Sequence, residues 1–160
     1  MIKRTNRGFI LVLPVLLLLL ASCNSNVLFT ASAAMKNKTW QLMNTPVFKV
    51  PVNDTLNSNN IFFIIRTGSD YPFRNIFLFV TAISPEGIEL TDTLQYYLAD
   101  DKGKWYGNGF GDIHELSLPY RSNVFFPSKG EYLFKIRHGM RIKDLPGVYD
   151  IGLRVERISK

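Results

Sequence analysis

The sequence predicts an all-β fold, an antiparallel β-sandwich or jelly-roll-like arrangement of about seven or eight strands. Three observations support this prediction. From residue 46 onward, short apolar stretches alternate with polar residues at a period of two, the spacing of a strand with one buried face. Clusters of Gly, Pro, Asn, Asp and Ser separate these stretches. The 160 residues include 12 Phe, 7 Tyr and 2 Trp, and aromatic side chains favour strands.

The expected strands follow one another with short turns between them. In the first, Phe48 and Val50 share a face, and Pro51 indicates a sheet edge because proline cannot donate a ladder hydrogen bond. The stretch 76–83 is apolar on both faces, as expected in the middle of a covered sheet. The turn Ser-Pro-Glu-Gly at 84–87 predicts a hairpin. The expected strands are 48–52, 61–66, 76–83, 88–98, 115–120, 132–138 and 151–156, with 124–127 as a further short apolar stretch.

The first 22 residues have the pattern of a secretory signal peptide. Three basic side chains precede an apolar stretch at 9–20, and small residues follow it. The apolar stretch has 12 residues and contains Pro14, whereas a membrane-spanning helix needs about 20. We therefore expect a signal peptide in place of a permanent membrane span.

The residues Leu20-Ala21-Ser22-Cys23 resemble a bacterial lipobox, in which the cysteine thiol receives diacylglycerol and the new amino terminus is acylated. Each buried methylene contributes about 0.8 kcal/mol, so two or three acyl chains hold a domain at a membrane. Cys23 is the one cysteine of the chain, which excludes an intramolecular disulfide. The predicted organisation is a lipoprotein signal peptide at 1–22, a lipidated N-terminus and tether at 23–45, and the sandwich domain at 46–160.

The net charge expected for the mature chain is ordinary. The formal net charge is +6, and removal of Lys3, Arg4 and Arg7 with the signal peptide leaves +3. Such a value gives no support for nucleic-acid binding.

No acidic residue lies between Cys23 and Asp54. This absence favours the outer membrane over the inner membrane or surface export, with the domain facing the periplasm.

The two histidines are the first candidates for catalysis or metal binding. Asp112 and His114 lie on one side of an extended segment, where the carboxylate could orient the imidazole. Structural metal sites need three or four ligands, and no His or Cys cluster supplies the others. His138 lies on the apolar face of its strand, so we expect a hydrogen-bonded, partly buried side chain. The sequence predicts no catalytic residue, no metal site and no cofactor.

The stretch 99–111 contains four glycines and three aromatic residues, Trp105, Tyr106 and Phe110. It lacks the Lys and Ser/Thr of a phosphate-binding loop, and Asp100-Asp101 reads as a solvated turn. Two interpretations stay open for the aromatic rings. They either contact a protein partner or a glycan, or fold back over the open end of the core. Tyr71, in the turn 71–74, is a lesser contact candidate.

Several segments together are similar to a known family. They are NIFFIIRTGSDYPFRNIFLFV, DTLQYYLADDKGKWYGNGFGDIHELSLPY, VFFPSKGEYLFKIRHGMR and GVYDIGLRVE. With the lipobox, these segments resemble the gliding motility-associated lipoprotein GldH family of the Bacteroidota, from about residue 60 to residue 156. The most specific part runs from Asp92 to Tyr120.

The resemblance implies a non-enzymatic, membrane-anchored accessory of gliding motility and of the linked type IX secretion machinery. It implies partners among other cell-envelope proteins, and it assigns a role to Cys23 alone, as the lipid site. An alternative from a different class is a carbohydrate-binding outer-membrane lipoprotein. That alternative requires exposed aromatic rings that form a flat platform beside polar side chains.

Overall fold

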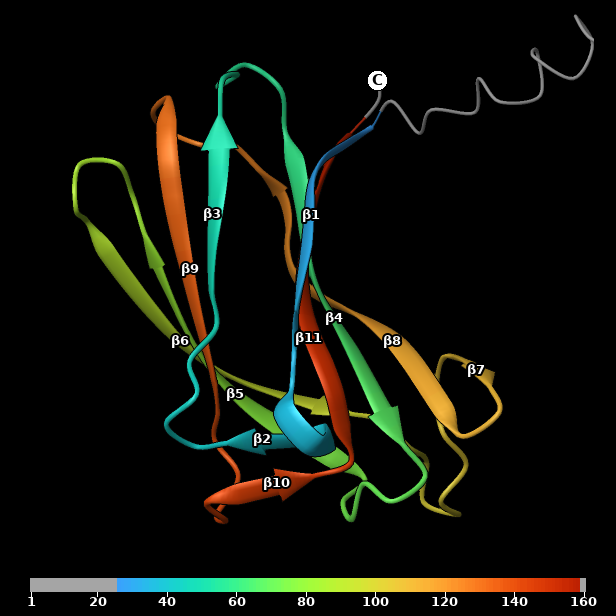
Figure 1. Ribbon diagram of the computed structural model, residues 1–160. Helices are drawn as coiled ribbons and strands as arrows, with labels where there is room; N and C mark the ends of the chain where they lie inside the picture. Colours follow the sequence, from blue (N-terminus) through green and yellow to red (C-terminus); the bar gives the residue numbers. More distant parts are fainter. Residues whose placement is uncertain (1–25, 159–160) are drawn as a thin grey trace, which may run out of the picture.

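A computed structural model describes residues 26–158, in which two antiparallel β-sheets pack face to face (Figure 1). The signal peptide and Cys23 lie outside the described residues. In spatial order, one sheet contains β1 (Val27–Ala34), β11 (Val148–Arg157), β4 (Asn59–Gly68), β8 (Ile113–Val124) and β7 (Asn108–Phe110). The other contains β3 (Val47–Val52), β9 (Gly130–His138), β5 (Asn75–Ile83) and β6 (Glu89–Tyr97). A small third sheet pairs β10 (Asp144–Pro146) with β2 (Thr39–Gln41), and the 3-10 turn η1 (Lys36–Lys38) directly precedes β2. The predicted all-β, antiparallel fold class is confirmed.

The hydrophobic core lies between the two large sheets. Alternate residues of β4, β11 and β8 face alternate residues of β3, β9 and β5, as the period of two requires. Across the sheets, the rings of Tyr120 and Phe134 meet edge to face with centroids 6.5 Å apart. The Tyr96 hydroxyl donates to the carbonyl of Pro119 at 2.8 Å and links β6 to β8. The fully buried side chains include Phe63, Ile65, Ile76, Leu78, Val80, Ile136, Ile151, Leu153 and Val155.

The structure corrects the predicted tether at 23–45. From residue 27 onward this segment is part of the fold, because β1 pairs antiparallel with β11 from Val27 to Ala34. β2 pairs with β10, and Trp40 within β2 has no exposed surface. The folded domain therefore begins about 20 residues before the predicted boundary at 46. Three residues, 24–26, separate Cys23 from the first strand.

Gly152 allows β1 to approach β11 closely. A Cβ atom at this position would lie 2.9 Å from the carbonyl oxygen of Ala31, closer than real side chains come. Opposite Gly152, β1 has only the small residue Ser32. The close contact of these two backbones follows from small residues on both strands.

The sandwich has two ends with different contents. At the terminal end, β1 begins, β11 ends, and the connections 53–58 and 125–129 cross between the sheets (Figure 1). At the distal end lie η1, β2 and β10, together with the connections 69–74 and 98–107 (Figure 1). Within residues 26–158, no helix has the length and hydrophobicity needed to cross a membrane.

Two phenylalanines on neighbouring strands test the assignment of the core. Phe134 is 2% exposed between the sheets, whereas Phe79 is half-buried on the outer face, with the Arg137 guanidinium 4.9 Å from its ring. Phe134→Ala should lower the free energy of unfolding by about 3–5 kcal/mol, because it leaves a cavity in the core. Phe79→Ala should lower the free energy of unfolding by clearly less. Urea denaturation of the two purified variants measures the difference, and equal losses would contradict this arrangement of the sheets.

Candidate functional site

The predicted aromatic loop lies at the distal end and is held by backbone hydrogen bonds. The amide of Leu98 donates to the carbonyl of Arg74 at 2.7 Å, and the amide of Tyr106 donates to the carbonyl of Leu98 at 2.8 Å. Ala99 and Trp105 form an isolated antiparallel bridge. The connection 98–107 is therefore a narrow loop attached to the start of β5.

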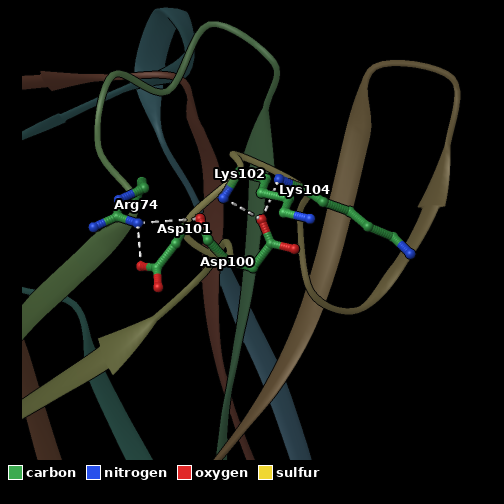
Figure 2. A network of polar contacts seen from close by, with 5 residues as sticks. All are labelled: Arg74, Asp100, Asp101, Lys102 and Lys104. Carbon is green, nitrogen blue, oxygen red and sulfur yellow. Dashed lines mark hydrogen bonds and ion pairs between the residues drawn. The ribbon is translucent and has the colours of Figure 1, made fainter.

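Two acidic side chains, Asp100 and Asp101, stabilise this loop through hydrogen bonds and an ion pair, as Figure 2 shows. The Asp100 carboxylate accepts hydrogen bonds from the amides of Lys102 and Lys104, each at 2.8 Å. The Arg74 guanidinium pairs with the Asp101 carboxylate at 2.6 Å and also donates to the carbonyl of Asp100 at 3.3 Å. Both carboxylates are thus engaged in building an exposed turn, in agreement with the interpretation from the sequence.

The aromatic side chains of the loop have different environments. Trp105 is half-buried and stacks on the His114 ring, with centroids 5.2 Å apart and an angle of 13° between the planes. The Tyr71 ring meets Trp105 edge-on at 6.1 Å and is only 4% exposed. Tyr106 is 48% exposed. The side chain of Phe110 lies outside what the structure describes.

Tyr71 is a structural residue of the distal end. Its hydroxyl donates to the carbonyl of Asn75 at 2.9 Å, and burial raises its pKa. The neighbouring Gly147 has φ of +74°, and a Cβ atom there would lie 2.5 Å from the backbone nitrogen of Tyr71. Only glycine fits at this position, where the turn before β11 presses on the connection 69–74.

Trp40 closes the distal end of the core, a role that the sequence did not reveal. Its indole donates to the carbonyl of Asn44 at 2.8 Å, and the side chain of Leu145 on the paired strand β10 is also fully buried. The Trp40 ring meets His138 edge-on, with centroids 5.5 Å apart. A three-residue strand is too short to show a periodic pattern, so the large apolar side chain of Trp40 was the one sign in the sequence that this segment is buried.

The structure separates the two histidines. His114 at the start of β8 lies beside Trp105, and its ring contact is a stack. His138 is fully buried at the end of β9, and neither ring nitrogen has a hydrogen-bond partner among the described residues. The sequence predicted a partly buried His138, whereas the structure buries its side chain completely. In the part of the chain that the structure describes, no three His, Cys, Asp or Glu side chains gather as a metal site.

Comparisons with known proteins assign the family. The family model described as GldH lipoprotein matches residues 27–155. The chain belongs to the GldH lipoprotein family. The match begins at the first residue of β1, so this strand lies within the family's domain.

Two relatives in the GldH family cover nearly the whole chain. The gliding motility lipoprotein GldH of Flavobacterium johnsoniae is 33% identical over 95% of this chain and 96% of its own length. The GldH homolog of Christiangramia forsetii is 30% identical over 88% of this chain and 90% of its own length. These matches confirm the family resemblance found in the sequence. The protein is a gliding-motility lipoprotein of the cell envelope.

One solved structure was found to match this chain at low similarity. Dimeric latent PorU from Porphyromonas gingivalis is 15% identical, and the match covers 82% of this chain but 13% of PorU. The TM-score of this match is 0.29.

The buried His138 makes stability depend on pH. Burial lowers its pKa below the ordinary value of 6.5, so between these two values the unfolded chain binds more protons than the folded one. The stability that the folded protein gains by keeping His138 neutral is complete above about pH 6.5, and it is lost as the pH falls toward the pKa of the folded state. Between about pH 7 and pH 5, the free energy of unfolding should therefore fall more in the natural protein than in His138→Leu. Urea denaturation at both pH values measures this difference, and parallel losses in the two proteins would contradict it.

Proposed function

We propose that this gliding-motility lipoprotein is a non-enzymatic accessory of the gliding machinery and of the linked type IX secretion machinery. Acyl chains on Cys23 hold it to the outer membrane, and its domain faces the periplasm. The observation that carries the proposal is the lipobox, which ends three residues before the first strand of a GldH-family domain. An anchor this close to the fold keeps the whole domain at the membrane.

The contacts of the polar side chains support a role without catalysis. Asp100 and Asp101 bind backbone amides and Arg74, and His114 stacks on Trp105. His138 is buried behind Trp40 at the distal end. These four side chains are therefore engaged in the hydrogen bonding and packing of the fold.

The distal end is the face that we propose for contact with other envelope proteins. It lies opposite the terminal end, where the chain leads to Cys23 (Figure 1). Tyr106 is 48% exposed on a loop that Asp100 and Arg74 hold in place. An exposed aromatic ring on a rigid loop loses little conformational entropy on binding and is a frequent anchor in protein interfaces.

The geometry favours a protein contact over carbohydrate binding. A sugar platform needs neighbouring aromatic rings with open faces. Trp105 is half-buried, with His114 stacked on its ring and Tyr71 packed edge-on against it. Of the neighbours Trp105 and Tyr106, Tyr106 is therefore the one with an exposed ring. Trp105 acts chiefly as a cover for the core, one of the two interpretations that the sequence left open.

Complementation of a deletion strain tests the proposed function. We expect the deletion to block colony spreading and to trap secreted cargo inside the cell, and the natural gene to restore both. Cys23→Ser should give an uncut precursor that takes up no labelled palmitate and restores neither activity. Ser25→Ala is the matched control and should behave as the natural protein. Normal spreading and export in the deletion strain would contradict the proposed function.

The same assay locates the contact surface. Tyr106→Ala should weaken spreading and export while the protein stays folded and membrane-bound, because the Tyr106 side chain is 48% exposed and lies outside the core. Val47→Ala removes a comparably exposed side chain from the outer face of β3 and should leave both activities unchanged. Full activity of Tyr106→Ala would place the contact surface elsewhere.

A further inference from the structure

The terminal end of the sandwich lies within a short distance of Cys23. The folded part begins at Asn26, whose carbonyl accepts a hydrogen bond from the Arg157 amide at 2.7 Å. An extended chain spans at most about 3.6 Å per residue, so Cys23 lies within roughly 11 Å of Asn26. The acyl chains of a lipidated cysteine start at its thiol and amino group, which places that residue at the level of the lipid headgroups. The terminal end is therefore adjacent to the bilayer.

Leu56 projects from the terminal end on a well-held turn. It is 86% exposed, although the turn around it is not loose. The Asp54 carboxylate accepts from the Leu56 amide at 2.8 Å and from the Asn57 side chain at 2.6 Å. These hydrogen bonds lower the pKa of Asp54, and its carboxylate also pairs with Arg157 at 3.0 Å. The connection 53–58 is thus fixed to the end of β11 with Leu56 turned away from the core.

The connection 125–129 presents a second apolar side chain at the same end. Phe126 is 5% exposed and packs against the Tyr132 ring at 4.8 Å, whereas its neighbour Phe125 is 57% exposed. Lys129 adds an exposed positive charge to the same connection, which suits the phosphates of lipid headgroups.

An apolar cleft joins these two connections to β1. Leu28, which is 41% exposed, lines it together with Phe126 and Val155, and the ion-paired Asp54 and Arg157 also line it. Its volume is about 230 Å³. The cleft shows that the start of β1, the end of β11 and both connections form one continuous surface.

We propose that this surface rests on the phospholipid bilayer, with Leu56 and Phe125 inserted among the headgroups, so that the domain stands in one fixed orientation. The inference rests on the lipidation of Cys23 proposed above and goes beyond it, since an acyl anchor alone does not determine which face meets the membrane. The short chain between Cys23 and Asn26 is the reason for choosing lipid as the occupant. A partner protein at this surface would have to fit within the same roughly 11 Å.

Tryptophan fluorescence in vesicles with brominated acyl chains tests the proposal. The mature, acylated protein is reconstituted into phosphatidylethanolamine–phosphatidylglycerol vesicles, with Leu56→Trp or Phe125→Trp as the probe. Met43→Trp is the matched control, because Met43 is 90% exposed near the distal end. The two native tryptophans also lie at the distal end and give a constant background. All three positions are exposed, so the substitutions remove little packing.

The expected result is a loss of at least about half of the added emission for Leu56→Trp and Phe125→Trp, because an interfacial side chain lies roughly 5–10 Å into the headgroup–acyl boundary. The emission added by Met43→Trp should not change. Vesicle-bound protein without quenching at positions 56 and 125 would overturn the orientation and leave the anchor intact. If an aqueous quencher did not reach positions 56 and 125 and the brominated acyl chains did not quench them either, a protein would cover these positions. That result would also overturn the proposed orientation. Failure of the natural protein to float with the vesicles would overturn the anchor and the orientation together.

Discussion

The antiparallel pairing of β1 with β11 determines how the domain is attached to the rest of the chain. β11 lies between β1 and β4, and its inward residues Ile151, Leu153 and Val155 are fully buried. β1 adds the partly buried Phe29, Ala31 and Ala33 to the edge of the same core. Because Gly152 lets the two backbones approach closely, the N-terminal segment becomes an edge strand and does not remain a free tether.

This pairing separates the two ends to which we assign the proposed contacts. It brings Asn26 to the end of β11, and the Asp54–Arg157 ion pair fixes the connection 53–58 at the same place. The attachment to the membrane and the proposed bilayer contact therefore share the terminal end. The distal end carries the exposed Tyr106 on a loop held by its own hydrogen bonds. A rigid sandwich between the two ends would hold the proposed contact loop at a constant distance from the membrane, which a long flexible tether would not do.

Much of the fold could be predicted from the sequence because several strands have strong contrast between their two faces. Phe48, Val50 and Val52 share one face and alternate with Lys49 and Pro51, and Tyr132, Phe134 and Ile136 share one face against Glu131, Lys135 and Arg137. β1 lacks this contrast, since its inward positions include two alanines and its outward positions include Leu28. β2 and β10 have three residues each, too few for a period to appear. The location of Trp105 against His114 depends on contacts between β8 and a loop, which no local pattern encodes.

Amide hydrogen exchange on the intact mature protein tests the pairing of β1 with β11 most directly. Backbone amides that donate across the β1–β11 ladder exchange only when that ladder opens, whereas amides of a free tether exchange at the rate of an unfolded peptide. We expect the β1 amides directed at β11 to be strongly protected, although less than those of β4 in the middle of the sheet. Exchange of all amides from 27 to 34 at the unprotected rate, with β11 and β4 still protected, would contradict the account.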